Sequence, residues 1–126
     1  MRYRFVPQRE NYEDYASGRV LVGMPGNPTF PVRLASELLQ RCAEIAVSAG
    51  QTRPFSLYDP CCGAAYHLTV IGHLHTRQIR EIVGSDIDAE ALTIAKRNLR
   101  TLSLEGIEER MQELAAMRDA FGKSSH

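Results

Sequence analysis

Two aspartates, Asp59 and Asp86, directly follow two short apolar segments that we expect to be parallel strands. The first segment covers residues 55–58 and the second covers residues 81–85. Because the carboxyl ends of neighbouring parallel strands meet at one edge of a sheet, both carboxylates are expected at one crevice. A carboxylate about 20 residues beyond a glycine turn is suited to the hydroxyls of a ribose. The pattern therefore predicts a site for a nucleoside cofactor.

The loop after the first predicted strand favours one class of cofactor. Pro60 stops the strand and Gly63 permits a tight turn, but the loop lacks the Gly-x-Gly-x-x-Gly pattern that brings backbone amides onto a pyrophosphate. Asp59 at the entrance of the loop would repel a pyrophosphate. It suits a positively charged ligand without phosphate, and S-adenosylmethionine carries an ammonium and a sulfonium group. We therefore favour S-adenosylmethionine, with an NAD-binding module as an alternative.

Cysteines and histidines near this loop raise a metal hypothesis, which the spacing does not support. Cys61 and Cys62 are adjacent and lack the two-residue separation of a zinc knuckle, and His73 and His75 fall on different faces of one predicted helix. No base is placed to activate either thiol as a nucleophile. We expect neither a metal site nor a catalytic thiolate.

Length and composition are typical of one globular domain. The chain has 126 residues, of which 44% are hydrophobic and 24% charged, and its formal net charge is zero. It contains no apolar run approaching the ~18 residues of a membrane span. Three cysteines do not form a disulfide framework, so we expect a reducing cytoplasm and no membrane partner.

The chain divides into an N-terminal arm and loop, residues 1–30, and the first part of a cofactor-binding domain, residues 31–126. The arm is expected to be irregular apart from a candidate strand at 19–22, and its tyrosines and arginines form either a partly ordered tail or an RNA-stacking arm. Helical spacing of apolar residues predicts a helix from Pro31 to Gly50, a second over 64–75 and a third that begins after the capping residue Asp88. A last helix is expected over 107–121, and its apolar side would carry Ile107, Met111, Leu114 and Phe121.

This pattern supplies only one strand–helix–strand unit. An α/β sheet of the doubly wound, Rossmann-like class has several more strands with helices on both faces. Two strands would leave a long unpaired edge. We therefore expect an α/β, Rossmann-like fold of which this chain is the N-terminal half.

Four segments resemble one enzyme family: 16–21 (Ala-Ser-Gly-Arg-Val-Leu), 30–35 (Phe-Pro-Val-Arg-Leu-Ala), 59–63 (Asp-Pro-Cys-Cys-Gly) and 85–88 (Ser-Asp-Ile-Asp). They are similar to the avilamycin-resistance type of 23S ribosomal RNA guanine-N1 methyltransferase, and the helix from Ala91 and the closing stretch from Arg118 to Lys123 resemble it too. The resemblance implies a class I methyltransferase that uses S-adenosylmethionine and acts on ribosomal RNA. Members are roughly twice as long, so it also implies a truncated copy or a fragment.

The resemblance also implies which residues bind the cofactor. Asp86 would hold the ribose, Ile87 would pack on the adenine, and the first loop would contact the methionine part. The predicted cofactor-binding residues are Asp59, Pro60, Cys61, Gly63, Asp86 and Ile87.

Two departures from the family pattern accompany this prediction. Ala65 stands where the family has a glycine, and a left-handed backbone there would be strained by ~1–2 kcal/mol. No counterpart of the acceptor-side Asp-Leu-Pro-Tyr motif follows Pro60, and no residue is placed as the base for the guanine proton. The alternative function is a non-catalytic remnant or a binding module that depends on a partner.

Overall fold

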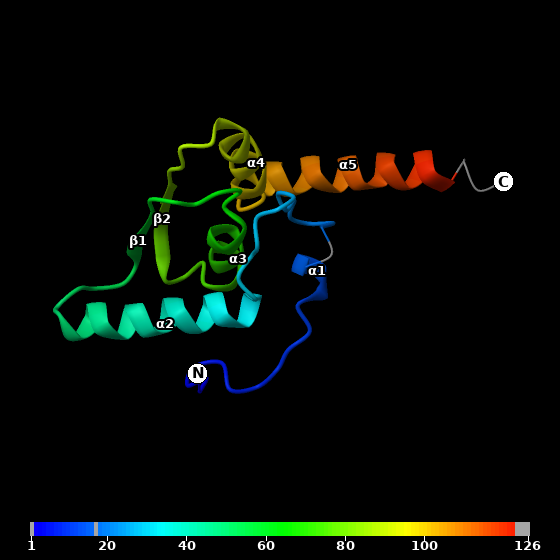
Figure 1. The fold of residues 1–126 in the computed structure, drawn as a ribbon. Coiled ribbons are helices and arrows are strands. Elements are labelled where there is room, and N and C mark those ends of the chain that lie inside the picture. The colour runs from blue at the N-terminus through cyan, green and yellow to red at the C-terminus, as the bar shows by residue number, and fades with distance from the viewer. Residues whose placement is uncertain (1, 17, 123–126) are drawn as a thin grey trace.

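A computed structural model of the chain describes residues 2–16 and 18–122 and shows two parallel strands flanked by helices (Figure 1). Ser17, Lys123 and the last three residues, which belong to segments discussed above, lie outside the described residues. No helix in the described part is long and apolar enough to cross a membrane. The elements are, in order, α1 (Glu13–Ala16), α2 (Val32–Ser48), β1 (Phe55–Asp59), α3 (Tyr66–Leu74), β2 (Ile79–Gly84), α4 (Ala89–Arg100) and α5 (Leu104–Gly122).

The two predicted strands form the expected parallel pair, with α3 as the connection between them. Leu57 lies opposite Ile82 and Asp59 lies opposite Gly84, so both strands end at the same level. The predicted α/β fold class is confirmed by the two parallel strands and the helices packed on them.

One face of the sheet carries the core. Leu57 packs against buried residues of α2 and also against Leu68 of α3 and Ala95 of α4. The opposite face is open in the described part of the chain, where the side chains of Tyr58 and Val83 are 61% and 45% exposed. The helices α2, α3 and α4 therefore lie on the same side of the two strands.

The candidate strand at 19–22 is wrong, because a side chain takes the place of a strand partner. Asn98 of α4 is buried, and its Nδ2 donates to the Val22 carbonyl while its Oδ1 accepts from the Val22 backbone N–H. Leu21 is fully buried in a cluster with Val32 and Tyr66. The segment is therefore bent and anchored, and one amide side chain satisfies both backbone groups of Val22.

Helix α5 begins at Leu104 and extends away from the rest of the fold (Figure 1). The apolar side predicted for it is largely exposed: Met111 and Phe121 are 64% and 70% exposed. The contact is instead made by Gly106, which lies against the backbone of Arg100, and by Arg110, whose guanidinium donates to the carbonyls of Gly18 and Arg19.

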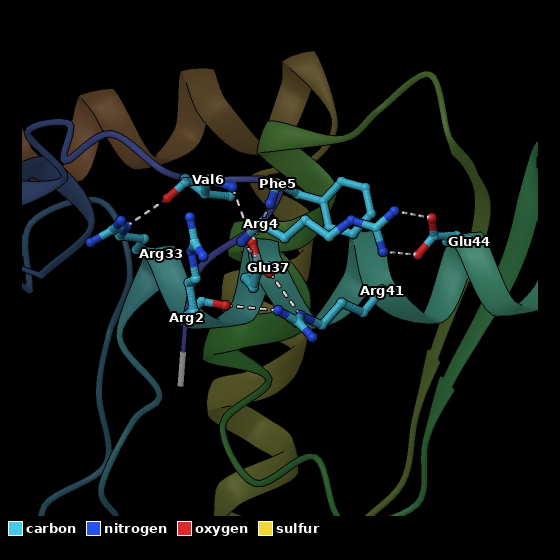
Figure 2. A network of polar contacts seen from close by, with 8 residues as sticks. All are labelled: Arg2, Arg4, Phe5, Val6, Arg33, Glu37, Arg41 and Glu44. Carbon is cyan, nitrogen blue, oxygen red and sulfur yellow. Dashed lines mark hydrogen bonds and ion pairs between the residues drawn. The ribbon is translucent and has the colours of Figure 1, made fainter.

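The N-terminal arm is not a partly ordered tail, because a buried carboxylate of α2 fixes it (Figure 2). Glu37 has no exposed surface. Its two oxygens accept backbone N–H groups of Arg4, Phe5 and Val6 at 2.8, 2.7 and 3.0 Å, and also the Nε of Arg41 at 2.7 Å.

Arginines close the arm onto α2 on either side of this carboxylate (Figure 2). Arg33 donates to the carbonyls of Val6 and Pro7, and its guanidinium lies over the Tyr3 ring at 3.9 Å. Arg4 forms a two-bond ion pair with Glu44. Tyr3 and Arg4 are thus engaged within the chain, which removes them from the hypothetical RNA-stacking arm.

The groups that donate hydrogen bonds to Glu37 favour its ionised form. Burial by itself raises the pKa of Glu37, but the N–H groups of Arg4, Phe5 and Val6 and the guanidinium of Arg41 outweigh it and lower the pKa from 4.5 to about 2. A carboxyl group with a lowered folded-state pKa stabilises the fold above its unfolded pKa, and this contribution is lost as pH falls through the folded value.

We therefore expect Glu37→Gln to lower the urea midpoint at neutral pH, because the amide cannot accept all four bonds and carries no charge. The difference from the unmodified chain should be constant above about pH 4.5 and shrink toward about pH 2, where Glu37 itself becomes protonated. Urea unfolding followed by circular dichroism across this range measures it. Glu44→Gln is the control, since that ion pair is exposed and should matter little. Equal effects of the two substitutions would contradict the proposed anchor.

Candidate functional site

The two strand ends are joined by backbone hydrogen bonds that continue past the sheet. The Ser85 N–H donates to the Asp59 carbonyl at 3.0 Å, and the Cys62 N–H donates to the Ser85 carbonyl at 2.9 Å. These bonds hold the loop after β1 beside the loop after β2. The carboxylates of Asp59 and Asp86 consequently face the same cavity, as the sequence predicted.

Asp86 ties the two loops together through its side chain. Its Oδ2 accepts the Gly63 N–H at 2.8 Å and its Oδ1 accepts the Asp88 N–H at 2.9 Å. The bonds from Asp88 and Gly63 lower the pKa of Asp86, so it is ionised at neutral pH. Gly63 has a φ of 53°, a left-handed backbone conformation that a glycine adopts without steric cost.

Asp59 has two partners of its own. Its Oδ1 accepts the Cys61 N–H at 2.9 Å, and its Oδ2 lies 2.6 Å from Nε2 of His67 in the first turn of α3. The Phe30 ring lies 5.5 Å from the His67 ring. Asp59 is therefore held in the lining of the cavity by a backbone bond and by an imidazole that lies beside an aromatic ring.

The cavity between these groups has a volume of about 610 Å³, which is ordinary for a small-molecule site. Three carboxylates, from Asp59, Asp86 and Asp88, lie in its lining, and none of the described residues that line it is Lys or Arg. The local field therefore favours a cation. A ligand with hydroxyl groups and positive charge matches this set of acceptors.

Four of the six predicted site residues line this cavity: Asp59, Cys61, Gly63 and Asp86. Pro60 and Ile87 are not part of the lining. Pro60 accepts a hydrogen bond from the Ser85 hydroxyl through its carbonyl, and the Ile87 side chain is fully exposed beside Asp86.

The sequence reading missed one wall of the cavity. Met24, Asn27, Thr29 and Phe30, from the largely exposed loop before α2, line it. The proline- and glycine-rich composition indicates a loop but not what the loop faces. His67 was also missed as a site residue; it follows Asp59 by eight positions, a spacing that gains meaning only once the turn and α3 fold back over β1.

Asp88 caps α4, as predicted, by accepting the N–H groups of Glu90 and Ala91. Cys62 is buried, and burial together with the nearby Asp59 and Asp86 raises the pKa of its thiol. The thiol is therefore protonated at neutral pH and is not a nucleophile. The described residues contain no group of three metal-ligating side chains.

Ala65 has the left-handed backbone that its position was suspected to require. Its φ and ψ are 53° and 30°, and it immediately precedes α3 without a side-chain cap. Ala65 is fully buried, and its N–H donates to the Cys62 carbonyl at 2.8 Å. Packing and this bond hold an alanine in a conformation that costs ~1–2 kcal/mol.

Comparison with known proteins gives one consistent result. The family described as rRNA methyltransferase AviRa matches residues 1–126. A relative from Streptomyces viridochromogenes, named 23S rRNA (guanine(2535)-N(1))-methyltransferase, is 43% identical over 124 residues, which are 98% of this chain and 48% of the relative.

Solved structures of the rRNA methyltransferase aviRa from Streptomyces viridochromogenes have the same fold. One superposes with a TM-score of 0.87 at 42% identity and covers 99% of this chain and 49% of the other. A second gives a TM-score of 0.86 at 41% identity, with 97% and 48% covered. The chain spans about half the length of the relatives it matches.

Two neighbouring alanines allow the strain at the loop to be measured. Ala64 and Ala65 are both buried, but only Ala65 has a positive φ among the described non-glycine residues. Ala64→Gly should cost ~1–2 kcal/mol, from lost methyl burial and the greater freedom of the unfolded chain. Ala65→Gly has the same losses but relieves ~1–2 kcal/mol of strain, so its stability should be nearly unchanged. Urea unfolding measures both, and equal losses would show that position 65 is unstrained.

Proposed function

The chain belongs to the AviRa family of rRNA methyltransferases, and on that premise we propose that its acidic cavity binds S-adenosylmethionine for transfer of a methyl group to a guanine ring nitrogen of 23S ribosomal RNA. The observation that carries the proposal is the cavity at the ends of two parallel strands, with three carboxylates and neither lysine nor arginine among its described lining residues. Such a lining disfavours a pyrophosphate and favours a sulfonium and an ammonium group. The bound cofactor would supply an electrophilic methyl group.

Asp86 is proposed to hold the ribose. Each of its oxygens accepts one backbone N–H, and a carboxylate oxygen has capacity for a second donor, so both can also accept a ribose hydroxyl. Ile87 follows it with a fully exposed apolar side chain, which an adenine ring would cover. Both positions therefore fit a nucleoside placed over the end of β2.

Asp59 and the rest of the loop are proposed to contact the amino-acid part of the cofactor. The Asp59 carboxylate would attract its ammonium group, while Pro60, Cys61 and Gly63 shape the turn that faces it. The residues of this chain would orient the cofactor and exclude water from it. Positioning of this kind accounts for much of the acceleration of a direct displacement.

We also propose the division into an arm, residues 1–30, and the first part of the cofactor domain, residues 31–126. The arm is integrated with the domain, since Glu37 binds residues 4–6 and Asn98 binds Val22. We expect the protein to act in the bacterial cytoplasm, where ribosomal RNA is found.

Asp86→Ala tests the proposed ribose contact. We expect it to weaken binding of S-adenosylhomocysteine about tenfold or more, since the charged acceptor of two hydroxyls is lost. Isothermal calorimetry measures the affinity, and urea unfolding reports separately on the lost Gly63 bond. Asp119→Asn is the control, because Asp119 is an exposed residue of α5 that does not line the cavity, and it should leave the affinity unchanged. Unaltered affinity of Asp86→Ala would remove the proposed role, and absence of any binding by the unmodified chain would favour the non-catalytic alternative.

A further inference from the structure

A second cavity of about 630 Å³ adjoins the cofactor cavity. The two share Thr29, Phe30 and Tyr66 in their linings, so occupants of the two would be neighbours. Neither Asp59 nor Asp86 lines the second cavity. The arm contributes Arg9, Glu10, Tyr12 and Glu13 to its lining, and α2 contributes Arg33.

Packing and hydrogen bonds build this second cavity. The buried Tyr66 donates its hydroxyl to the Tyr15 carbonyl at 2.8 Å, which fixes α1 against α3. Tyr12 and Tyr15 pack on the cluster that contains Leu21 and Val32. The Asn11 side chain accepts the Glu13 N–H and shapes the turn before α1. The cavity is thus a formed feature of the arm and α2.

An exposed aromatic ring separates the two cavities. Phe30 is 50% exposed and rests beside His67. Tyr12 supplies a second ring on the side of the arm, and burial and the neighbouring Glu10 carboxylate raise its pKa. Aromatic rings of this kind stack on nucleobases. A base entering the second cavity would meet Phe30 at the boundary with the cofactor.

The charges in the second cavity point to one base. A site for phosphate alone would contain no acids, but here Glu10 and Glu13 accompany Arg9 and Arg33. Arg33 is engaged with carbonyls of the arm, whereas Arg9 is exposed and suited to a phosphate. Carboxylates accept hydrogen bonds, and guanine presents two adjacent donors, the ring N1–H and the 2-amino group. Adenine presents an acceptor at N1 and does not match.

We propose that this second cavity receives the acceptor guanosine of the RNA, with Phe30 stacking on the base, Glu10 and Glu13 accepting its donor edge, and Arg9 contacting an adjacent phosphate. The inference rests on the proposed function and adds the place and chemistry of acceptor recognition. It gives the arm a direct role in the choice of base.

The test uses two fluorescein-labelled uridine pentamers, one with a central guanosine and one with a central adenosine, and the 126-residue chain saturated with S-adenosylhomocysteine. Fluorescence anisotropy should show at least about fivefold tighter binding of the guanosine RNA. The double variant Glu10→Ala, Glu13→Ala should lose this preference, because both acceptors of the donor edge are removed. Arg9→Ala should weaken both RNAs alike.

Glu108→Ala, which removes an exposed carboxyl on α5, is the matched control and should leave both affinities unchanged. Since Arg9, Glu10 and Glu13 do not line the cofactor cavity, these variants should bind S-adenosylhomocysteine normally. A double variant that keeps the preference, or an unmodified chain that binds the cofactor analogue without preferring guanosine RNA, would overturn this inference alone. Failure to bind the cofactor analogue would instead contradict the proposed function.

Discussion

The hydrogen bond from the Gly63 N–H to the Asp86 carboxylate is the interaction on which the site depends. It connects the loop after β1 to the loop after β2 and continues the backbone bonds that join the strand ends. The bond is strengthened by the charge of Asp86, whose pKa it lowers, and Gly63 has the positive φ that a glycine tolerates in this loop. The cavity exists where these two loops are held side by side.

A carboxylate that binds backbone N–H groups also fixes the arm. Glu37 and Asp86 are carboxylates from regular elements or their ends that bind backbone N–H groups of irregular segments, and in both cases these bonds lower the pKa. Irregular backbone has unpaired donors, and a buried or partly buried anion satisfies several at once. Ala65 shows the complementary case, in which surrounding contacts impose a left-handed backbone on an alanine. Its neighbour Ala64 is held by a bond from Asn98 to its carbonyl.

The chain spans about half of its relatives, yet the residues proposed to bind the cofactor all lie between positions 59 and 87. The proposed guanosine cavity draws on the arm and the start of α2. Two cavities of different chemistry therefore meet at Phe30: one has acids and neither lysine nor arginine among its described lining residues, and the other has both acids and arginines. This contrast matches a cationic donor and a nucleotide acceptor, and it places the arm where the two would meet.

The sequence by itself determined the two parallel strands, the main helices and the convergence of Asp59 and Asp86, because strand length, helical periodicity and the strand-end rule are local properties of the chain. Only the tertiary structure decided how the arm is fixed, since Glu37 binds residues more than 30 positions away. It also decided that residues 19–22 are held by Asn98, that α5 contacts the fold through Gly106 and Arg110, and that Phe30 forms a cavity wall. Most of these features depend on contacts between residues that are far apart in the sequence, and no periodic pattern predicts such contacts.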